Sequence, residues 1–84
     1  MNLTNLKNQI LLNRRVLATM YETLAQVKAD KRFYDEQDDL EAEYATHNYL
    51  KWLRKQIASI VVLQKTLKAD VAYTLSIDRA NRVK

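Results

Sequence analysis

The sequence lacks glycine, proline and cysteine altogether. Without cysteine there is no disulfide framework and no thiolate for catalysis or metal binding. Without glycine there is no residue suited to shape a phosphate-binding loop or an oxyanion hole. Serines, threonines and a lone His47 are scattered along the chain and form no recognisable catalytic constellation. We therefore expect a protein that is not an enzyme and carries no cofactor.

Long hydrophobic runs are also missing. The longest nearly continuous apolar stretch is IASIVVL, residues 57–63, which is far too short to span a membrane. The N-terminal segment MNLTNLKNQILLNRR mixes polar side chains among its leucines, unlike a secretory signal peptide. These features predict a soluble protein of a reducing compartment, the cytoplasm, with no membrane span.

Apolar residues instead recur at alternating spacings of three and four residues in two segments, a pattern typical of coiled coils and helical bundles. We term each stripe the seam of its segment. The first seam comprises Leu3, Leu6, Ile10, Leu17, Met20, Leu24 and Val27, with Asn13 in the gap. The second seam comprises Leu50, Leu53, Ile57, Ile60, Leu67 and Val71, with Gln64 in the gap. Both segments are rich in strong helix formers.

The two seams predict an all-α fold, in which two long amphipathic helices form an antiparallel hairpin that assembles into a helical bundle. The helices are expected at about 3–32 and about 37–69, within a single domain spanning 1–84. Residues 70–84 then extend past the partner helix. They form either a short third helix capped by Asp70 or a continuation of the second helix toward a neighbouring subunit. Because no glycine or proline marks the turn, one unbroken helix is the alternative fold.

The net charge of +4 is unevenly distributed along the chain. Residues 32–43 carry six acids against one arginine, whereas the segments on either side are basic. This acidic middle contains the expected elbow of the hairpin, residues 33–39 (FYDEQDD). We predict that Asp35 caps the second helix, with Asp38 in its first turn, where negative charge suits the helix dipole. The basic residues expected in the last turn of the first helix are Lys28, Lys31 and Arg32.

The two segments resemble each other when the chain is shifted by 40 residues. NRRVLAT (13–19) then lies over LRKQIAS (53–59), and VKAD (27–30) lies over LKAD (67–70). Internal duplication of one helix and chance similarity between two amphipathic helices both account for this match. Under either account the segments are the same kind of amphipathic helix.

The broad apolar arcs predict self-association, because a chain of 84 residues buries only a modest core by itself. We therefore expect a homo-oligomer. Asn13 interrupts the first seam, and a buried polar residue at such a position commonly fixes register and oligomeric state. The predicted oligomer seam comprises Leu6, Ile10, Asn13, Leu17, Ile57, Ile60 and Leu67.

Aromatic residues are few, but three of them gather at the start of the second predicted helix. Packing against Phe33 and Tyr34, which would close the end of the hairpin, is the structural interpretation and the one we favour. The functional alternative is a surface that binds a partner protein, since tyrosine and tryptophan dominate binding hot spots. The candidate interface comprises Tyr44, Tyr49, Trp52, Val62 and Tyr73.

Most lysines and arginines of the second helix fall on one side when the helix is projected at about 100° per residue. Such a basic stripe with an aromatic among its members would suit phosphate groups. A solvated helix face is the alternative, and no helix-turn-helix, zinc or RNA-binding motif accompanies the stripe. The candidate phosphate-binding residues are Arg14, Arg15, Lys51, Arg54, Lys55, Lys65 and Lys68.

Asp39, Glu43 and His47 lie four residues apart and would share one face of a helix. Carboxylates and imidazole are metal ligands, but a metal site in a bundle needs matching ligands on a second helix. The first segment offers only Glu22 and Asp30. We therefore expect a solvated face here and no metal.

These observations predict a small non-enzymatic interaction module that self-associates and binds or blocks another macromolecule, as an adaptor or an inhibitor. A protein is the expected partner. The alternative is a nucleic-acid or anionic-nucleotide binder that uses the basic stripe on the second helix. Salt separates the two, because binding to phosphates weakens steeply as salt rises whereas binding through an apolar interface does not.

Overall fold

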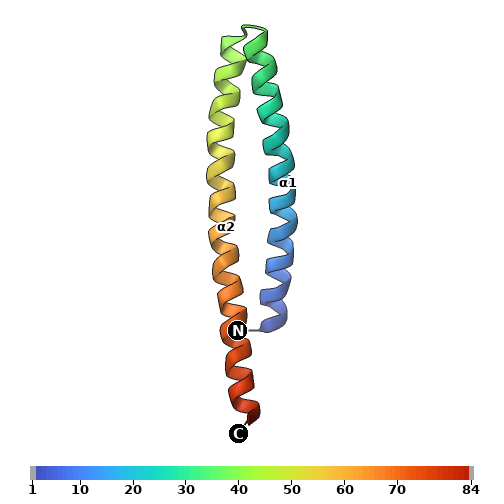
Figure 1. Ribbon diagram of the computed structural model, residues 1–84, viewed down its shortest axis with the longest axis vertical. Helices are drawn as coiled ribbons and strands as arrows, with labels where there is room; N and C mark the ends of the chain where they lie inside the picture. The colour runs from blue at the N-terminus through green and yellow to red at the C-terminus, as the bar shows by residue number, and fades with distance from the viewer. Residues whose placement is uncertain (1, 84) are drawn as a thin grey trace.

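The chain folds into two long helices joined by a tight turn. The computed structural model describes residues 2–83, with α1 at Leu3–Glu36 and α2 at Leu40–Val83. The helices run antiparallel along a rod of 70 × 15 × 14 Å, and both the start of α1 and the end of α2 lie in its lower part (Figure 1). The predicted all-α helical hairpin is therefore confirmed, and the alternative of one unbroken helix is wrong.

The two seams meet along the inner sides of α1 and α2. The apolar residues buried between the helices are Leu6, Leu50, Leu53, Ile57 and Leu67. Other members of the seams are half-buried, among them Ile10, Leu17, Met20 and Ile60. The residues predicted to form an oligomer seam thus lie at the contact between two helices of the same chain. A second copy would need another surface.

The turn is made by aspartates in place of glycine. Asp38 has φ 55°, in the left-handed region that aspartate tolerates better than most residues. Its amide donates to the carbonyl of Asp35 at 3.1 Å, and the amide of Asp39 donates to the carbonyl of Tyr34 at 3.0 Å. This pair of hydrogen bonds is a Schellman motif, which satisfies the last carbonyls of α1 and stops the helix.

Three predictions about the elbow are wrong because α1 continues for one more turn than expected. Residues 33–36 are helical, so Asp35 lies inside α1 and does not cap α2. Asp38 lies in the turn and not in the first turn of α2, which begins at Leu40. The basic residues expected in the last turn of α1 lie before it, namely Lys28, Lys31 and Arg32.

Asp39 is the residue that caps α2. Its Oδ1 accepts a hydrogen bond from the amide of Ala42 at 3.1 Å, as the side chain of an N-cap residue does. Glu41 and Glu43 follow in the first turn of α2, where their charge suits the helix dipole. A capping aspartate directly after a Schellman stop allows the chain to reverse between two helices within three residues, 37–39.

The C-terminal part of α2 extends beyond α1 as a single helix. α2 has 44 residues against 34 in α1, and its last turns project past the start of α1 (Figure 1). Asp70 lies within α2, so the expectation of a third helix folding back is wrong for the described residues, and the continuing helix is what the structure shows. Residues 75–82 are all exposed. Lys84, the last residue of the predicted extension, lies outside the described residues.

Replacing Asp39 by alanine is expected to destabilise the hairpin by about 0.5–2 kcal/mol, because the substitution removes the hydrogen-bond acceptor at the N-cap of α2. Asp35→Ala is the matched control. This side chain lies in the last turn of α1, where a negative charge is unfavourable, so we expect no loss or a slight gain in stability. Urea unfolding followed by circular dichroism compares the two variants. A larger loss for Asp35→Ala would contradict the assignment of the cap.

Candidate functional site

Antiparallel pairing sorts the exposed residues of both helices onto two flanks of the hairpin. Arg14 and Tyr21 of α1 and Val61 and Lys68 of α2 each follow a seam residue directly, and they line one groove. Positions seven residues away along either helix lie on the same flank. We term this flank the basic face. Its cations are Lys7, Arg14, Lys28, Arg32, Lys51, Arg54, Lys65, Lys68, Arg79 and Arg82.

The opposite flank differs sharply in charge. Asp30 of α1 and Tyr49 of α2 line a depression on it, and each directly precedes a seam residue. This flank consists of the positions at seven-residue steps from Asp30 and Tyr49 and of the adjacent positions on the outer side of each helix. Between Gln9 and Ile77, none of these positions holds a lysine or an arginine. We term this flank the cation-free face. The hairpin is therefore asymmetric about its core, with most of its positive charge on one side.

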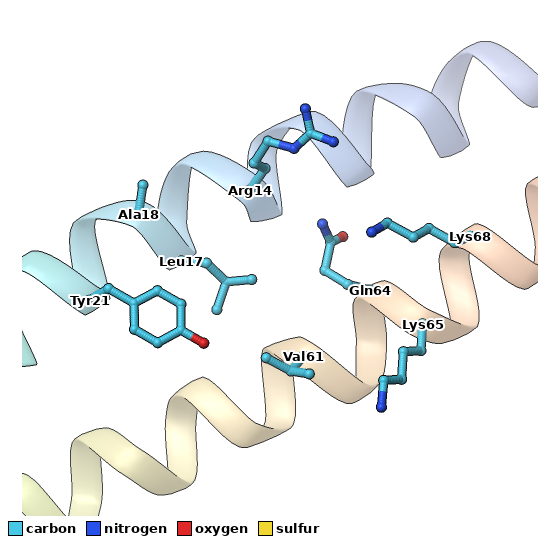
Figure 2. A pocket seen from close by; sticks show the side chains of 8 residues that line it. All are labelled: Arg14, Leu17, Ala18, Tyr21, Val61, Gln64, Lys65 and Lys68. Carbon is cyan, nitrogen blue, oxygen red and sulfur yellow. The ribbon is translucent and has the colours of Figure 1, made fainter.

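The groove on the basic face has a volume of about 440 Å³ and is open to solvent. Arg14 from α1 and Lys65 and Lys68 from α2 supply its charges. In Figure 2 the Lys68 ammonium lies in front of the gap between the two helices, near the amide of Gln64. The Tyr21 ring points from α1 toward Val61 and forms one end of the groove. Lys68 thus points into the opening and Tyr21 closes one end of it, whereas the Arg14 guanidinium and the Lys65 ammonium point away from the gap between the helices (Figure 2).

A second basic groove of about 350 Å³ lies closer to the elbow. Its cations are Lys28, Lys31, Arg32 and Arg54. Asp35 and Glu43 also line it, on the side of the turn. The acids therefore lie at one end of the basic face, and the first groove has none in its lining.

The structure brings together some of the predicted phosphate-binding residues and separates others. Arg14, Lys65 and Lys68 share the first groove, and Arg54 lines the second. Lys51 lies on the same flank at seven-residue spacing from Lys65 through Ala58. The two that point away from the seam are Arg15 and Lys55. Sequence reasoning missed the contribution of α1 to the second groove, because which residues face each other depends on the pairing register of the helices.

Gln64 is the buried polar residue of the seam. Its side chain is 7% exposed, and its Nε2 donates to the carbonyl of Ile10 on α1 at 3.0 Å. Its Oε1 is buried and accepts no hydrogen bond within the described part of the chain. Leaving such an acceptor unpaired costs about 1–3 kcal/mol. Asn13, the predicted register residue, is only half-buried. The buried side-chain hydrogen bond between the two helices is made by Gln64.

The cation-free face exposes much of the apolar surface of the molecule. Eight large apolar side chains with exposed fractions of 37–68% lie on it: Leu12, Val16, Phe33, Tyr49, Trp52, Leu63, Tyr73 and Ile77. Thr19, Thr23, Gln56, Ser59 and Thr66 lie between them. A surface on which exposed apolar side chains alternate with uncharged polar ones is common at interaction sites in proteins.

The candidate interface aromatics fall in different places. Tyr49 stacks on Trp52, with ring centroids 5.8 Å apart, and shares a depression with Tyr34 near the elbow. Trp52 and Tyr73 lie on the cation-free face. Tyr44 lies beside His47 on the other flank. Val62, 63% exposed, points away from the seam. The five residues therefore do not form one patch, but three of them belong to the cation-free face.

Two further findings concern metal binding and membrane spans among the described residues. No group of three or more histidine and carboxylate side chains within residues 2–82 is close enough together to hold a metal ion. Neither α1 nor α2, over the part that the structure describes, contains a stretch apolar and long enough to cross a bilayer. Asp39, which was considered with Glu43 and His47 as a possible metal-binding set, caps α2 through its side chain.

Comparison of the chain with protein-family models, with curated proteins and with solved structures finds no match. The functional interpretation therefore depends on the two faces themselves.

Proposed function

We propose that the chain is a non-enzymatic helical interaction module that pairs with a second copy through its cation-free face. The basic face then points outward and is available to another macromolecule, so that the protein acts as an adaptor or an inhibitor. The observation that carries this proposal is the separation of charge and apolar surface onto opposite flanks. A cysteine-free chain also suits the reducing cytoplasm, where we place the protein.

The hairpin alone leaves much apolar surface in water. Its buried apolar core consists of five leucine and isoleucine side chains, whereas eight large apolar residues are exposed on the cation-free face. A short chain with so small a core commonly gains stability by oligomerisation. Covering the cation-free face supplies that gain, because each Å² of apolar surface removed from water contributes about 25 cal/mol.

Charge selects this face over the opposite one for contact between copies. Two basic faces would bring rows of lysine and arginine together, and like charges across an interface are strongly unfavourable. Two cation-free faces meet without that penalty. α1 is about 50 Å long at 1.5 Å per residue, so a strip about 15 Å wide along it has an area of about 750 Å², close to the share of one partner in a standard interface.

The projecting end of α2 enlarges the same surface. Tyr73 and Ile77 lie on the cation-free side of this segment and line a depression with Asp70. Because α1 does not cover this part of α2, these side chains are free to contact a second copy. The proposal thus gives a role to the length difference between the two helices.

Sedimentation equilibrium at micromolar concentration tests the proposed association. We expect a mass that rises with concentration to twice the monomer mass of 9.9 kDa or beyond. Association should change little between low and high salt, because the contact is mainly apolar. A monomer at all concentrations, with cooperative unfolding that is independent of concentration, would overturn the proposed function.

A further inference from the structure

The basic face brings together cations that the hairpin does not need for its own stability. Charges that flank a helical seam stabilise the pairing when they are opposite across it. Here α1 contributes Arg14 and α2 contributes Lys65 and Lys68 to one groove, with no acid in its lining. Figure 2 shows Lys68 pointing into the gap between the helices, with the Arg14 guanidinium and the Lys65 ammonium on its outer edges. Three like charges beside one groove oppose helix pairing, and an anionic ligand would relieve the repulsion.

The positive charge is repeated along the hairpin at a regular interval. Arg14 and Lys28 are separated by fourteen residues on α1, as are Arg54 and Lys68 on α2. At 1.5 Å per residue both intervals are about 21 Å. The two grooves therefore form two cationic stations in line along one face. An extended polyanion would reach both stations, whereas a small anion would occupy only one.

Tyr21 supplies a stacking surface in the first of these grooves, which Arg14, Lys65 and Lys68 also line. Its ring is 50% exposed and points from α1 across the groove toward Val61 (Figure 2). Aromatic rings beside a cationic groove are the usual means of holding unpaired bases, because every base can stack on them. A base in a duplex is stacked and paired on the inside, where Tyr21 does not reach it.

We infer that the basic face binds single-stranded nucleic acid. One base stacks on Tyr21, and Arg14, Lys65 and Lys68 hold the adjoining phosphates. The strand continues to the second station at Lys28, Arg32 and Arg54. This inference concerns the face left outward in the proposed assembly. It does not require self-association, since all of its groups belong to one chain.

Fluorescence anisotropy with short labelled single strands of mixed sequence, both DNA and RNA, tests the inference. We expect binding at low salt, with log K falling against log salt by about 0.7 for each phosphate contacted. Duplex DNA of the same sequence should bind at least about tenfold more weakly, because its bases are already stacked. Binding of poly-glutamate or of anionic vesicles as tightly as the single strand, or no binding of any strand, would overturn it.

Paired substitutions with equal loss of charge locate the site. Arg14→Gln/Lys68→Gln is expected to weaken binding about tenfold or more and to reduce the salt slope by about 1.4, for two phosphates lost. The matched control is Arg15→Gln/Lys55→Gln on the outer side, which should change binding by less than about twofold. All four side chains are exposed, so both variants should fold. Equal effects of the two pairs would mean attraction by net charge only, and would overturn the site.

A neutral substitution separates base contacts from phosphate contacts. Tyr21→Ala should weaken single-strand binding at least about fivefold, the lower end for loss of a stacked base, with the salt slope unchanged. Unaltered affinity in Tyr21→Ala would overturn the stacking assignment. A monomer by sedimentation that still binds the strand would reject the proposed assembly and leave this inference intact.

Discussion

The double variant Val16→Arg/Leu63→Arg is expected to be a monomer at concentrations where the parent chain associates. Val16 and Leu63 are exposed on the cation-free face, one on each helix. In the proposed pair of copies, each arginine would be buried without a partner. Unpaired charge at an interface costs several kcal/mol, and about 2.8 kcal/mol is a hundredfold in affinity. We therefore expect the dissociation constant to rise at least about a hundredfold by sedimentation equilibrium.

A control with the same added charge distinguishes this effect from general repulsion. Ala18→Arg/Ala58→Arg places two arginines on the basic face, and both variants raise the net charge from +4 to +6. Ala18 and Ala58 are exposed, so the substitutions should be tolerated by the fold. The control should associate nearly as the parent chain does. Equal dissociation of both variants would show that net charge, and not the cation-free face, governs association.

Leu53→Ala is expected to cause the largest loss of stability of any single substitution considered. Leu53 is 2% exposed, the most buried apolar residue of the hairpin core. Truncating a buried leucine to alanine costs about 2–5 kcal/mol, because apolar contacts are lost and a cavity is left. For a chain with five buried apolar residues, this is a large share of the free energy of unfolding. Urea unfolding at fixed protein concentration measures it.

Val62→Ala provides the reference for that measurement. Val62 lies on the same helix but is 63% exposed and points away from the seam. Surface substitutions of this kind usually change stability by less than about 0.5 kcal/mol. Similar losses at both positions would contradict the packing of the hairpin core.

Much of the fold follows from the spacing of apolar residues. Leu50, Leu53 and Ile57 recur at intervals of three and four residues, and this pattern places them on one side of a helix in any tertiary context. The absence of glycine and proline left the turn poorly marked. Its position at residues 37–39 depends on Asp38 adopting a left-handed conformation. Aspartate visits this conformation only occasionally, so the residue type alone does not mark the turn.

The two faces could be predicted only in part. The basic stripe of the second helix was visible from projection, because Arg54, Lys65 and Lys68 share one helix and their relative angles are fixed. The joining of this stripe to Arg14 and Lys28 depends on the register between the helices. Register is set by the position of the turn and by cross-helix contacts such as that of Gln64 with Ile10. A one-helix projection holds no information about either.

The packing of the two helices also decides which polar residue of the seam becomes buried. Asn13 and Gln64 each occupy a gap between apolar residues, and the sequence favoured the asparagine as the register residue. The longer side chain of Gln64 reaches the backbone of α1 and becomes buried, whereas Asn13 stays half-buried. Reach across an interface depends on the distance between helices, which follows from tertiary packing and not from periodicity.

The central claim, that copies meet through the cation-free face and leave the basic face open, is tested most directly by thiol alkylation. Because the parent chain has no cysteine, Ser59→Cys and Ala58→Cys each provide one thiol. The two positions are neighbours in sequence, both exposed in the single hairpin, and lie on opposite faces. Nearby cations alter thiol reactivity, so each variant is compared with itself at low and high protein concentration.

As concentration rises, we expect alkylation of Ser59→Cys by iodoacetamide to slow in proportion to the associated fraction measured by sedimentation. The rate for Ala58→Cys should stay constant. Protection of Ala58→Cys, or constant rates at both positions while the mass doubles, would contradict the proposed division of the hairpin into an association face and an open basic face.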